Sequence, residues 1–277
     1  MENHFHIPKL SDRLGSIAGM VSNGNSVCDV GCDHGFVSIY LVASGISPHV
    51  IAMDVRKGPL SRADEHIQAY KMENYIETRL SDGLAAYRAG EAQTLIVAGM
   101  GGPLMLRILE SYPKKTGSFQ ELILQPQSEI PAFRSTIREM GYEITEEKMV
   151  LEEGKYYPMM KVVPVQKQLT SLPELENAYG PHLLAERNPV LYQFLKKEET
   201  MVTELLERLQ KEASDRKDVV QQWKHRYELC RKALELYEEK NGTADGCVQC
   251  KKRKVKTKGR TTATHLIGMD SRKRNLP

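Results

Sequence analysis

The 277-residue sequence predicts an α/β protein: a mostly parallel, seven-stranded sheet that ends in an antiparallel hairpin, followed by a pair of C-terminal helices. Three observations predict this class. Short apolar runs alternate with amphipathic stretches through the first 165 residues, which is typical of βαβ units. Two strand-like runs then follow with only four residues between them. From residue 190 to 240 the chain lacks proline and glycine and repeats apolar side chains at helical spacing.

The βαβ part is expected to contain five strands and the helices that connect them. Most of the expected strands are short apolar runs, and the stretches between them carry apolar residues three or four positions apart. The expected strands are 26–30, 49–54, 76–80, 94–98 and 121–124, and the expected helices are 35–44, 59–71, 84–90, 102–111 and 129–140.

The next two runs, 142–151 and 156–163, are joined by Glu152-Glu153-Gly154-Lys155. This connection is too short for a parallel crossover, which needs a dozen or more residues, so it predicts an antiparallel hairpin. Five βα units closed by such a hairpin resemble the outline of class I (Rossmann-like) methyltransferases. A plain nucleotide-binding Rossmann domain would continue as βαβ instead. We therefore expect one domain over residues 1–165.

Two further segments precede the C-terminal tail. Residues 166–189 contain three prolines and are expected to be a linker with short helical pieces. Residues 190–240 are expected to form an antiparallel coiled-coil hairpin with its turn at Ser214 and Asp215. The alternative is one long helix that dimerises. The apolar stripes are Leu195, Val202 and Leu209 in the first half and Val220, Trp223, Tyr227, Cys230, Leu234 and Tyr237 in the second.

Charge is divided unevenly along the chain. Residues 241–277 hold ten Lys or Arg against two Asp, and because the whole chain has a formal charge of +3, residues 1–240 carry −5. An acidic body is a poor match for a broad phosphate-binding surface. The basic run 251–258 is able to contact phosphates without sequence preference. The same tail holds Cys247, Cys250 and His265, three potential zinc ligands and one fewer than a structural site needs.

We expect the tail 241–277 to be disordered, and we predict no metal site in the rest of the chain. Five scattered cysteines do not suggest a disulfide framework. No run approaches the ~18 apolar residues of a membrane span, and residues 1–15 lack the apolar segment of a secretory signal. A cytoplasmic protein is therefore expected, without a membrane partner.

The strongest functional signal follows the first strand and reads Asp29-Val30-Gly31-Cys32-Asp33-His34-Gly35. Its glycines let the backbone approach a ligand, and the helix that follows offers free N–H groups. A dinucleotide-binding GxGxxG turn holds a pyrophosphate there, which two carboxylates would repel. S-adenosyl-L-methionine instead carries an ammonium and a sulfonium, which carboxylates attract. The alternative is a tight turn without a ligand.

Further candidate residues stand where the next strands end. Asp54, with Val55 beside it, is placed to accept hydrogen bonds from ribose hydroxyls; its alternative role is an N-cap. Asp82 and Gly83 follow the third strand, where class I enzymes place the acid that meets the adenine amino group, although Asp-Gly is also a common turn. The fourth strand ends in Ala98-Gly99-Met100-Gly101-Gly102, which implies a backbone close to a ligand.

These motifs, together with Leu10-Ser11-Asp12-Arg13-Leu14, Leu122-Ile123-Leu124-Gln125-Pro126 and Glu152-Glu153-Gly154-Lys155-Tyr156, resemble the TrmK family of bacterial tRNA (adenine-N1)-methyltransferases. The resemblance covers residues 8–240 and implies that tRNA is methylated on N1 of the adenine at position 22, in the D-arm. It places the cofactor against Gly31, Asp33, His34, Asp54, Asp82, Gly83 and Met100, with Arg13 at the rim. Asp29, Gly35, Val55, Gly99 and Gly101 complete the predicted cofactor site. Many members read Gln-Pro-Asn where this chain has Gln125-Pro126-Gln127, which leaves the role of Gln127 open.

Adenine N1 has an in-plane lone pair and no proton to lose, so transfer needs alignment and exclusion of water rather than a strong base. Because N1 lies on the Watson–Crick edge, the base must be drawn into a pocket. We predict that Asp33 is catalytic and favours the cationic product. We predict that His34 is catalytic too, holding geometry or moving a proton late; its alternative role is to bond the backbone at the helix start.

Three other functions compete with this one. The first is a methyltransferase for a small molecule or protein, which the acidic body permits. The second is a non-catalytic RNA-binding adaptor, which four carboxylates at strand ends argue against. The third, an NAD-linked enzyme, is disfavoured by the missing GxGxxG motif. We expect a monomer, with a dimer through the coiled coil as the alternative.

Overall fold

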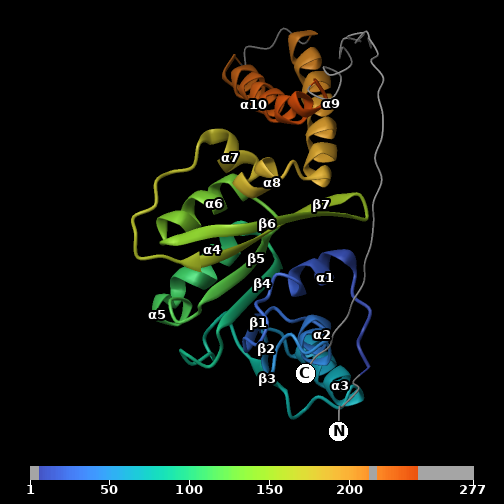
Figure 1. The fold of residues 1–277 in the computed structure, drawn as a ribbon, viewed down its shortest axis with the longest axis vertical. Coiled ribbons are helices and arrows are strands. Elements are labelled where there is room, and N and C mark those ends of the chain that lie inside the picture. Colours follow the sequence, from blue (N-terminus) through green and yellow to red (C-terminus); the bar gives the residue numbers. More distant parts are fainter. Residues whose placement is uncertain (1–5, 212–216, 243–277) are drawn as a thin grey trace, which may run out of the picture.

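A computed structural model describes residues 6–211 and 217–242 (Figure 1). Its strands are β1 (Val27–Val30), β2 (Val50–Asp54), β3 (Ile76–Leu80), β4 (Thr94–Met100), β5 (Glu121–Pro126), β6 (Tyr142–Glu152) and β7 (Lys155–Pro164). They form one sheet in the order β3-β2-β1-β4-β5-β7-β6. β1 to β5 run parallel, and β7 pairs antiparallel with both β5 and β6. The predicted seven-stranded sheet that closes with an antiparallel hairpin is confirmed.

Burial explains why the middle strands are continuous apolar runs. Every residue of β1, β2 and β5 is buried, because helices cover both faces of the sheet. The edge strand β6 instead alternates buried with more exposed residues. Helices α1 (Asp12–Ala18), α2 (Phe36–Ala43) and α3 (Lys57–Ala69) pack on one face, and α4 (Gly102–Ser111), α5 (Pro113–Thr116) and α6 (Ile130–Glu139) lie on the other (Figure 1).

The predicted helix at 84–90 is wrong, because this segment forms turns. Ser81 Oγ accepts a hydrogen bond from the backbone N–H of Ala86 at 3.0 Å. The ammonium of Lys115 donates to the carbonyls of residues 84 and 85. One local bond and two from a residue distant in sequence thus satisfy backbone groups that a helical ladder would otherwise use.

The C-terminal helices α9 (Pro189–Lys211) and α10 (Lys217–Gly242) pack against each other as an antiparallel pair. Tyr237, late in α10, donates from Oη to the carbonyl of Asn188, just before α9, at 3.0 Å. Arg226, nearer the start of α10, donates from Nε to Glu198 in α9 at 2.8 Å. The predicted helix pair is confirmed, coiled-coil packing stays a prediction, and the predicted turn at residues 214–215 lies outside the described residues.

A buried ion pair and a buried hydrogen bond meet between the short helices α7 (Glu174–Tyr179) and α8 (Pro181–Ala185). Arg134 in α6 and Glu147 in β6 are each 1% exposed at the side chain, and Nε and Oε1 are 2.9 Å apart. Gly180, with φ +98°, packs so closely that a Cβ would lie 2.5 Å from the Glu147 carboxylate. Tyr179 donates from Oη to Glu198 at 2.6 Å. We call these five residues the Tyr179–Gly180 junction; it fastens the helix pair to the sheet.

Within the part of the chain that the structure describes, no helix combines the length and apolarity that crossing a membrane requires. The predictions for the basic run 251–258 and for Cys247, Cys250 and His265 concern residues beyond the described part. The division of the chain at residues 165, 189 and 240 stays a prediction.

Candidate active site

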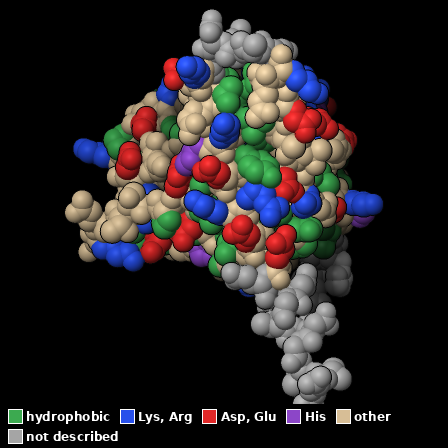
Figure 2. All heavy atoms as spheres, turned by 90° about the horizontal axis from the view of Figure 1, so that it is seen from above, with side chains coloured by type: hydrophobic (Ala, Val, Ile, Leu, Met, Phe, Trp, Pro, Cys, Tyr) green, Lys and Arg blue, Asp and Glu red, His purple; other side chains and the backbone are tan. Residues whose placement is uncertain are grey.

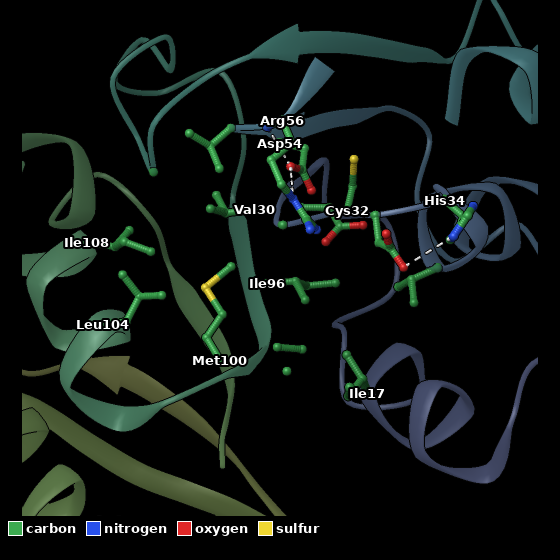
Figure 3. A pocket seen from close by; sticks show the side chains of 18 of the residues that line it. Ile17, Val30, Cys32, His34, Asp54, Arg56, Ile96, Met100, Leu104 and Ile108 are labelled. Carbon is green, nitrogen blue, oxygen red and sulfur yellow. Dashed lines mark hydrogen bonds and ion pairs between the residues drawn. The ribbon is translucent and has the colours of Figure 1, made fainter. Parts of the chain in front are cut away.

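A cavity of about 620 Å³ opens at the carboxyl ends of β1 to β4 (Figure 3). It lies where the strand order reverses, because β1 has β2 on one side and β4 on the other. Open parallel sheets bind ligands at such a point, and the volume is that of a small-molecule site. The lining residues are Arg13, Leu14, Ile17, Asp29, Val30, Gly31, Cys32, Asp33, His34, Phe36, Val37, Asp54, Val55, Arg56, Ser81, Asp82, Gly83, Ile96, Ala98, Gly99, Met100, Leu104, Ile108 and Gln127.

The loop after β1 brings backbone to the wall of the cavity. Gly31 has φ +80°, and its N–H donates to the carbonyl of Met53 at 2.8 Å. A Cβ on Gly31 would overlap Cε of Met100, so a side chain here would fill the space between the two loops. Gly35, with φ +73°, has a packing role instead: a Cβ would lie 3.1 Å from that of Ala63 in α3. Glycine is therefore required at both positions, for different reasons.

Asp29 is a buried carboxylic acid at the end of β1. It is 5% exposed, and Oδ2 accepts a hydrogen bond from Ser38 Oγ at 2.8 Å. Burial raises the pKa of Asp29 to about 6, although the Ser38 hydrogen bond acts to lower it, and the charge of Asp54 adds to the rise. A cationic ligand in the cavity would favour the ionised form and offset the burial.

Asp33 and His34 lie at the mouth of the cavity. Asp33 adopts φ +51°, which is uncommon for a residue other than glycine. Its carboxylate is 3.6 Å from Nε2 of His34, the pair joined by the dashed line at His34 in Figure 3. Nδ1 of His66 is 2.9 Å from the His34 carbonyl, and the two imidazole rings are 5.9 Å apart. The imidazole of His34 is therefore placed by neighbours on two sides.

Asp54 and Asp82 mark the ends of β2 and β3. Asp54 is buried, and Oδ1 accepts the backbone N–H of Arg56 at 2.8 Å, with the guanidinium 3.7 Å away. Val55 between them is 60% exposed, a large apolar side chain at the edge of the cavity. Asp82 is exposed, and Gly83 follows it with φ +53°, where a Cβ would press on α4 at 3.0 Å.

The end of β4 borders the other side of the cavity. Gly99 has φ +77°, and its N–H donates to Oε1 of the buried Gln125 at 3.1 Å. Arg13 donates from Nη1 to the same oxygen at 3.4 Å, and its Nε is 3.7 Å from Glu152. A Cβ on Gly99 would lie 3.9 Å from both Arg13 Nη1 and Gln127 Nε2. A methyl group here would thus be in van der Waals contact with a guanidinium and an amide, and glycine keeps the backbone exposed between them.

All but two of the predicted site residues line this cavity. Gly35 and Gly101 lie outside the lining; Gly101 has an ordinary φ of −63°, and a Cβ there would meet Ser128 Oγ at 3.1 Å. The apolar lining was not predicted, because apolar residues in a sequence are indistinguishable from core residues. Arg56 was not predicted either, although it lies two positions after Asp54. The apolar lining residues that were not predicted are Leu14, Ile17, Val30, Phe36, Val37, Ile96, Ala98, Leu104 and Ile108, and the polar ones are Cys32, Ser81 and Arg56; Gln127, whose role the sequence left open, also lines the cavity.

The balance of charge in the cavity favours a cation. Four carboxylates line it against two guanidinium groups, one of which is paired with Glu152. A pyrophosphate would be repelled, whereas an ammonium and a sulfonium would be attracted. The open backbone at Gly31 and the carboxylates at the strand ends therefore fit S-adenosyl-L-methionine. These carboxylates are Asp29, Asp33, Asp54 and Asp82.

The fold and this site define a Rossmann-like methyltransferase that uses S-adenosyl-L-methionine, and the methyltransferase domain family matches residues 10–160. The chain is 30% identical over 200 residues to the tRNA (adenine(22)-N(1))-methyltransferase of Bacillus subtilis (strain 168), covering 68% of this chain and 79% of that protein. This chain belongs to the TrmK family of tRNA (adenine(22)-N(1))-methyltransferases.

Solved structures of similar proteins agree with this membership. The crystal structure of Bacillus subtilis TrmK superposes with a TM-score of 0.72 at 28% identity, covering 82% of this chain and 99% of that one. Streptococcus pneumoniae Sp1610 in complex with S-adenosyl-L-methionine gives a TM-score of 0.72 at 31% identity, covering 82% of this chain and all of the other (100%).

Proposed function

We propose that this protein transfers a methyl group from S-adenosyl-L-methionine to N1 of adenine 22 in the D-arm of tRNA. The observation that carries the proposal is the acidic cavity at the reversal of strand order, in a chain that belongs to this family. The four carboxylates match a cationic methyl donor, and the cavity of about 620 Å³ extends past them to the uncharged Gly99 and Gln127, where a neutral base would fit.

When bound, S-adenosyl-L-methionine supplies a methyl group: the N1 lone pair forms the new N–C bond as the C–S bond breaks, leaving a neutral thioether and a cationic base. No proton has to leave N1, so the protein has to align the reactants and exclude water. We assign Asp54 to the ribose hydroxyls and Asp82 to the adenine amino group of the cofactor. Asp29, behind the β1 loop, offsets the positive charge of the donor.

Asp33 and His34 are the proposed catalytic residues. The carboxylate of Asp33 lies at the mouth, where an entering base would pass, and it stabilises positive charge that appears on the base during transfer. The imidazole of His66 contacts the backbone carbonyl of His34 and so fixes the position of His34. The imidazole of His34 in turn orients the Asp33 carboxylate.

The test is mass spectrometry of nucleosides from an unmodified tRNA transcript incubated with the protein and S-adenosyl-L-methionine. We expect N1-methyladenosine, and none from a transcript with guanine at position 22. Methyl transfer to a protein or metabolite extract but not to tRNA would overturn the proposal, as would a product formed without adenine 22. Asp33→Ala and His34→Ala should each lower kcat at saturating cofactor; full turnover in both removes their assignment.

We further propose that the protein acts as a monomer in the cytoplasm.

Lys, Arg, Asp and Glu side chains are intermixed on the face that carries α9 and α10 (Figure 2). A surface of mixed sign favours a limited number of phosphate contacts over broad electrostatic binding. Recognition then depends more on the cavity that receives the base.

A further inference from the structure

The cavity has two chemically different halves. Carboxylates from the ends of β1, β2 and β3 line one half. The other half is lined by Gly99 at the end of β4 and Gln127 just after β5, which carry no charge, and by Arg13 of α1, whose charge is paired with Glu152. A cationic methyl donor is attracted to the acidic half. The uncharged half is therefore the place for the neutral base that accepts the methyl group.

Gln127 is the amide in this half that is free to bind. Its backbone N–H donates to the carbonyl of Met100 at 2.8 Å, which fixes the residue just beyond β5. Its side chain lines the cavity and has no hydrogen bond to any other residue of the described chain. Gln125 differs, because it is buried and its Oε1 already accepts from Gly99 and Arg13. Gln125 therefore lies beneath the cavity wall, whereas Gln127 is exposed and lines the cavity.

We propose that Gln127 selects the acceptor adenine by bonding its Hoogsteen edge, an inference that rests on the proposed function. A glutamine amide matches adenine with two hydrogen bonds: Oε1 accepts from the N6 amino group, and Nε2 donates to N7. Both groups lie away from N1, which stays uncovered for transfer. Guanine presents two acceptors, O6 and N7, along the same edge, so Oε1 would face an acceptor. Leu104, 41% exposed in the same cavity, offers an apolar surface to the base.

The reaction itself strengthens one of these bonds. As N1 takes up the methyl group the base becomes cationic, so its N6–H becomes a stronger donor to Oε1 of Gln127. An interaction that grows toward the transition state raises kcat rather than only tightening binding. Loss of the amide therefore lowers kcat and raises KM for tRNA, while KM for S-adenosyl-L-methionine stays unchanged.

The experiment compares two substrates and four proteins. The substrates are an unmodified tRNA transcript and the same transcript with 7-deazaadenosine at position 22, which keeps N1 and the amino group but lacks the N7 acceptor. The proteins are the wild type, Gln127→Ala, Gln127→Asn, which keeps a shorter amide, and Gln120→Ala. Gln120 is an exposed amide at the opposite end of β5 and serves as the matched control.

We expect the wild type to lose about tenfold in kcat/KM on the 7-deaza transcript, and Gln127→Ala to lose about 10- to 100-fold on the normal one. The kcat/KM of Gln127→Ala should be the same on the 7-deaza transcript as on the normal one. On the normal transcript, the kcat/KM of Gln127→Asn should lie between those of Gln127→Ala and the wild type. Gln120→Ala should match the wild type on both transcripts. Equal losses on the 7-deaza transcript for the wild type and Gln127→Ala overturn the inference, as does a raised cofactor KM in Gln127→Ala. A wild type that leaves the normal transcript unmethylated refutes the proposed function, and this inference with it.

Discussion

The buried carboxyl of Asp29 makes stability depend on pH in the direction opposite to that of most acidic residues. Burial raises its pKa from 3.8 to about 6, so between these values the folded protein binds the proton more tightly than the unfolded chain does. The stability from this group is fully present below pH 3.8 and is lost as pH rises through 6. Asp29→Asn mimics the protonated state, because an amide stays neutral and can still accept from Ser38.

The rise of about two pKa units corresponds to about 3 kcal/mol, at 1.36 kcal/mol per unit. Most of it develops between pH 4 and pH 7, so we expect the free energy of unfolding of Asp29→Asn, relative to the wild type, to grow by about 2 kcal/mol over that range. Urea denaturation of both proteins without cofactor at pH 4, 5, 6 and 7 measures this difference. The other acidic groups are the same in both proteins, so their contributions to the pH dependence cancel in the difference. A difference that stays constant, or shrinks as pH rises, would refute the reasoning.

Two other predictions concern close packing and a buried charge. Gly31→Ala puts a methyl group against Met100 at a positive φ, so calorimetry should show cofactor affinity at least about tenfold lower; Gly24→Ala, with φ +88° and nothing within 4 Å, is the strain-matched control that should bind normally. Arg134→Met leaves the Glu147 carboxylate buried without its partner and should lower the free energy of unfolding by about 3–5 kcal/mol. Adding Glu147→Leu should recover most of that loss, and a double variant as unstable as Arg134→Met would contradict the explanation.

Strong periodicity made much of the fold predictable from the sequence. The expected strand 76–80 and helix 102–111 coincide with β3 and α4, and the four-residue connection allowed only a hairpin. Helix α1 was not expected, because seven residues are too few to show a helical period; its N-cap Ser11, which accepts from the N–H of Leu14 at 3.4 Å, was the available signal. At 84–90, contacts distant in sequence decided the conformation, notably the ammonium of Lys115.

The candidate site was predictable only in its polar part. Asp54 and Asp82 stand out in a sequence because Asp54 closes the second expected strand and Asp82 lies two positions after the third. Ile96 and Ile108 do not, since an apolar side chain reads the same whether it meets other side chains or a cavity. For Gln127, the sequence offered an amide after Pro126 but not the facing Gly99, which only the parallel pairing of β4 with β5 brings near.

The Tyr179–Gly180 junction determines which parts of the molecule can unfold locally and which must unfold together. Adjacent residues contact two different carboxylates, Glu147 in the sheet and Glu198 in α9, so neither contact can open without moving the other. In hydrogen exchange, the amides of α8 and β6 should then gain deuterium as one cooperative unit. The segment 165–173 is held instead by exposed contacts, such as the 3.2 Å ion pair of Lys167 with Glu143 in β6, and should accept inserted residues more readily. A single insertion after Tyr179 would pull the helix pair out of register with the sheet.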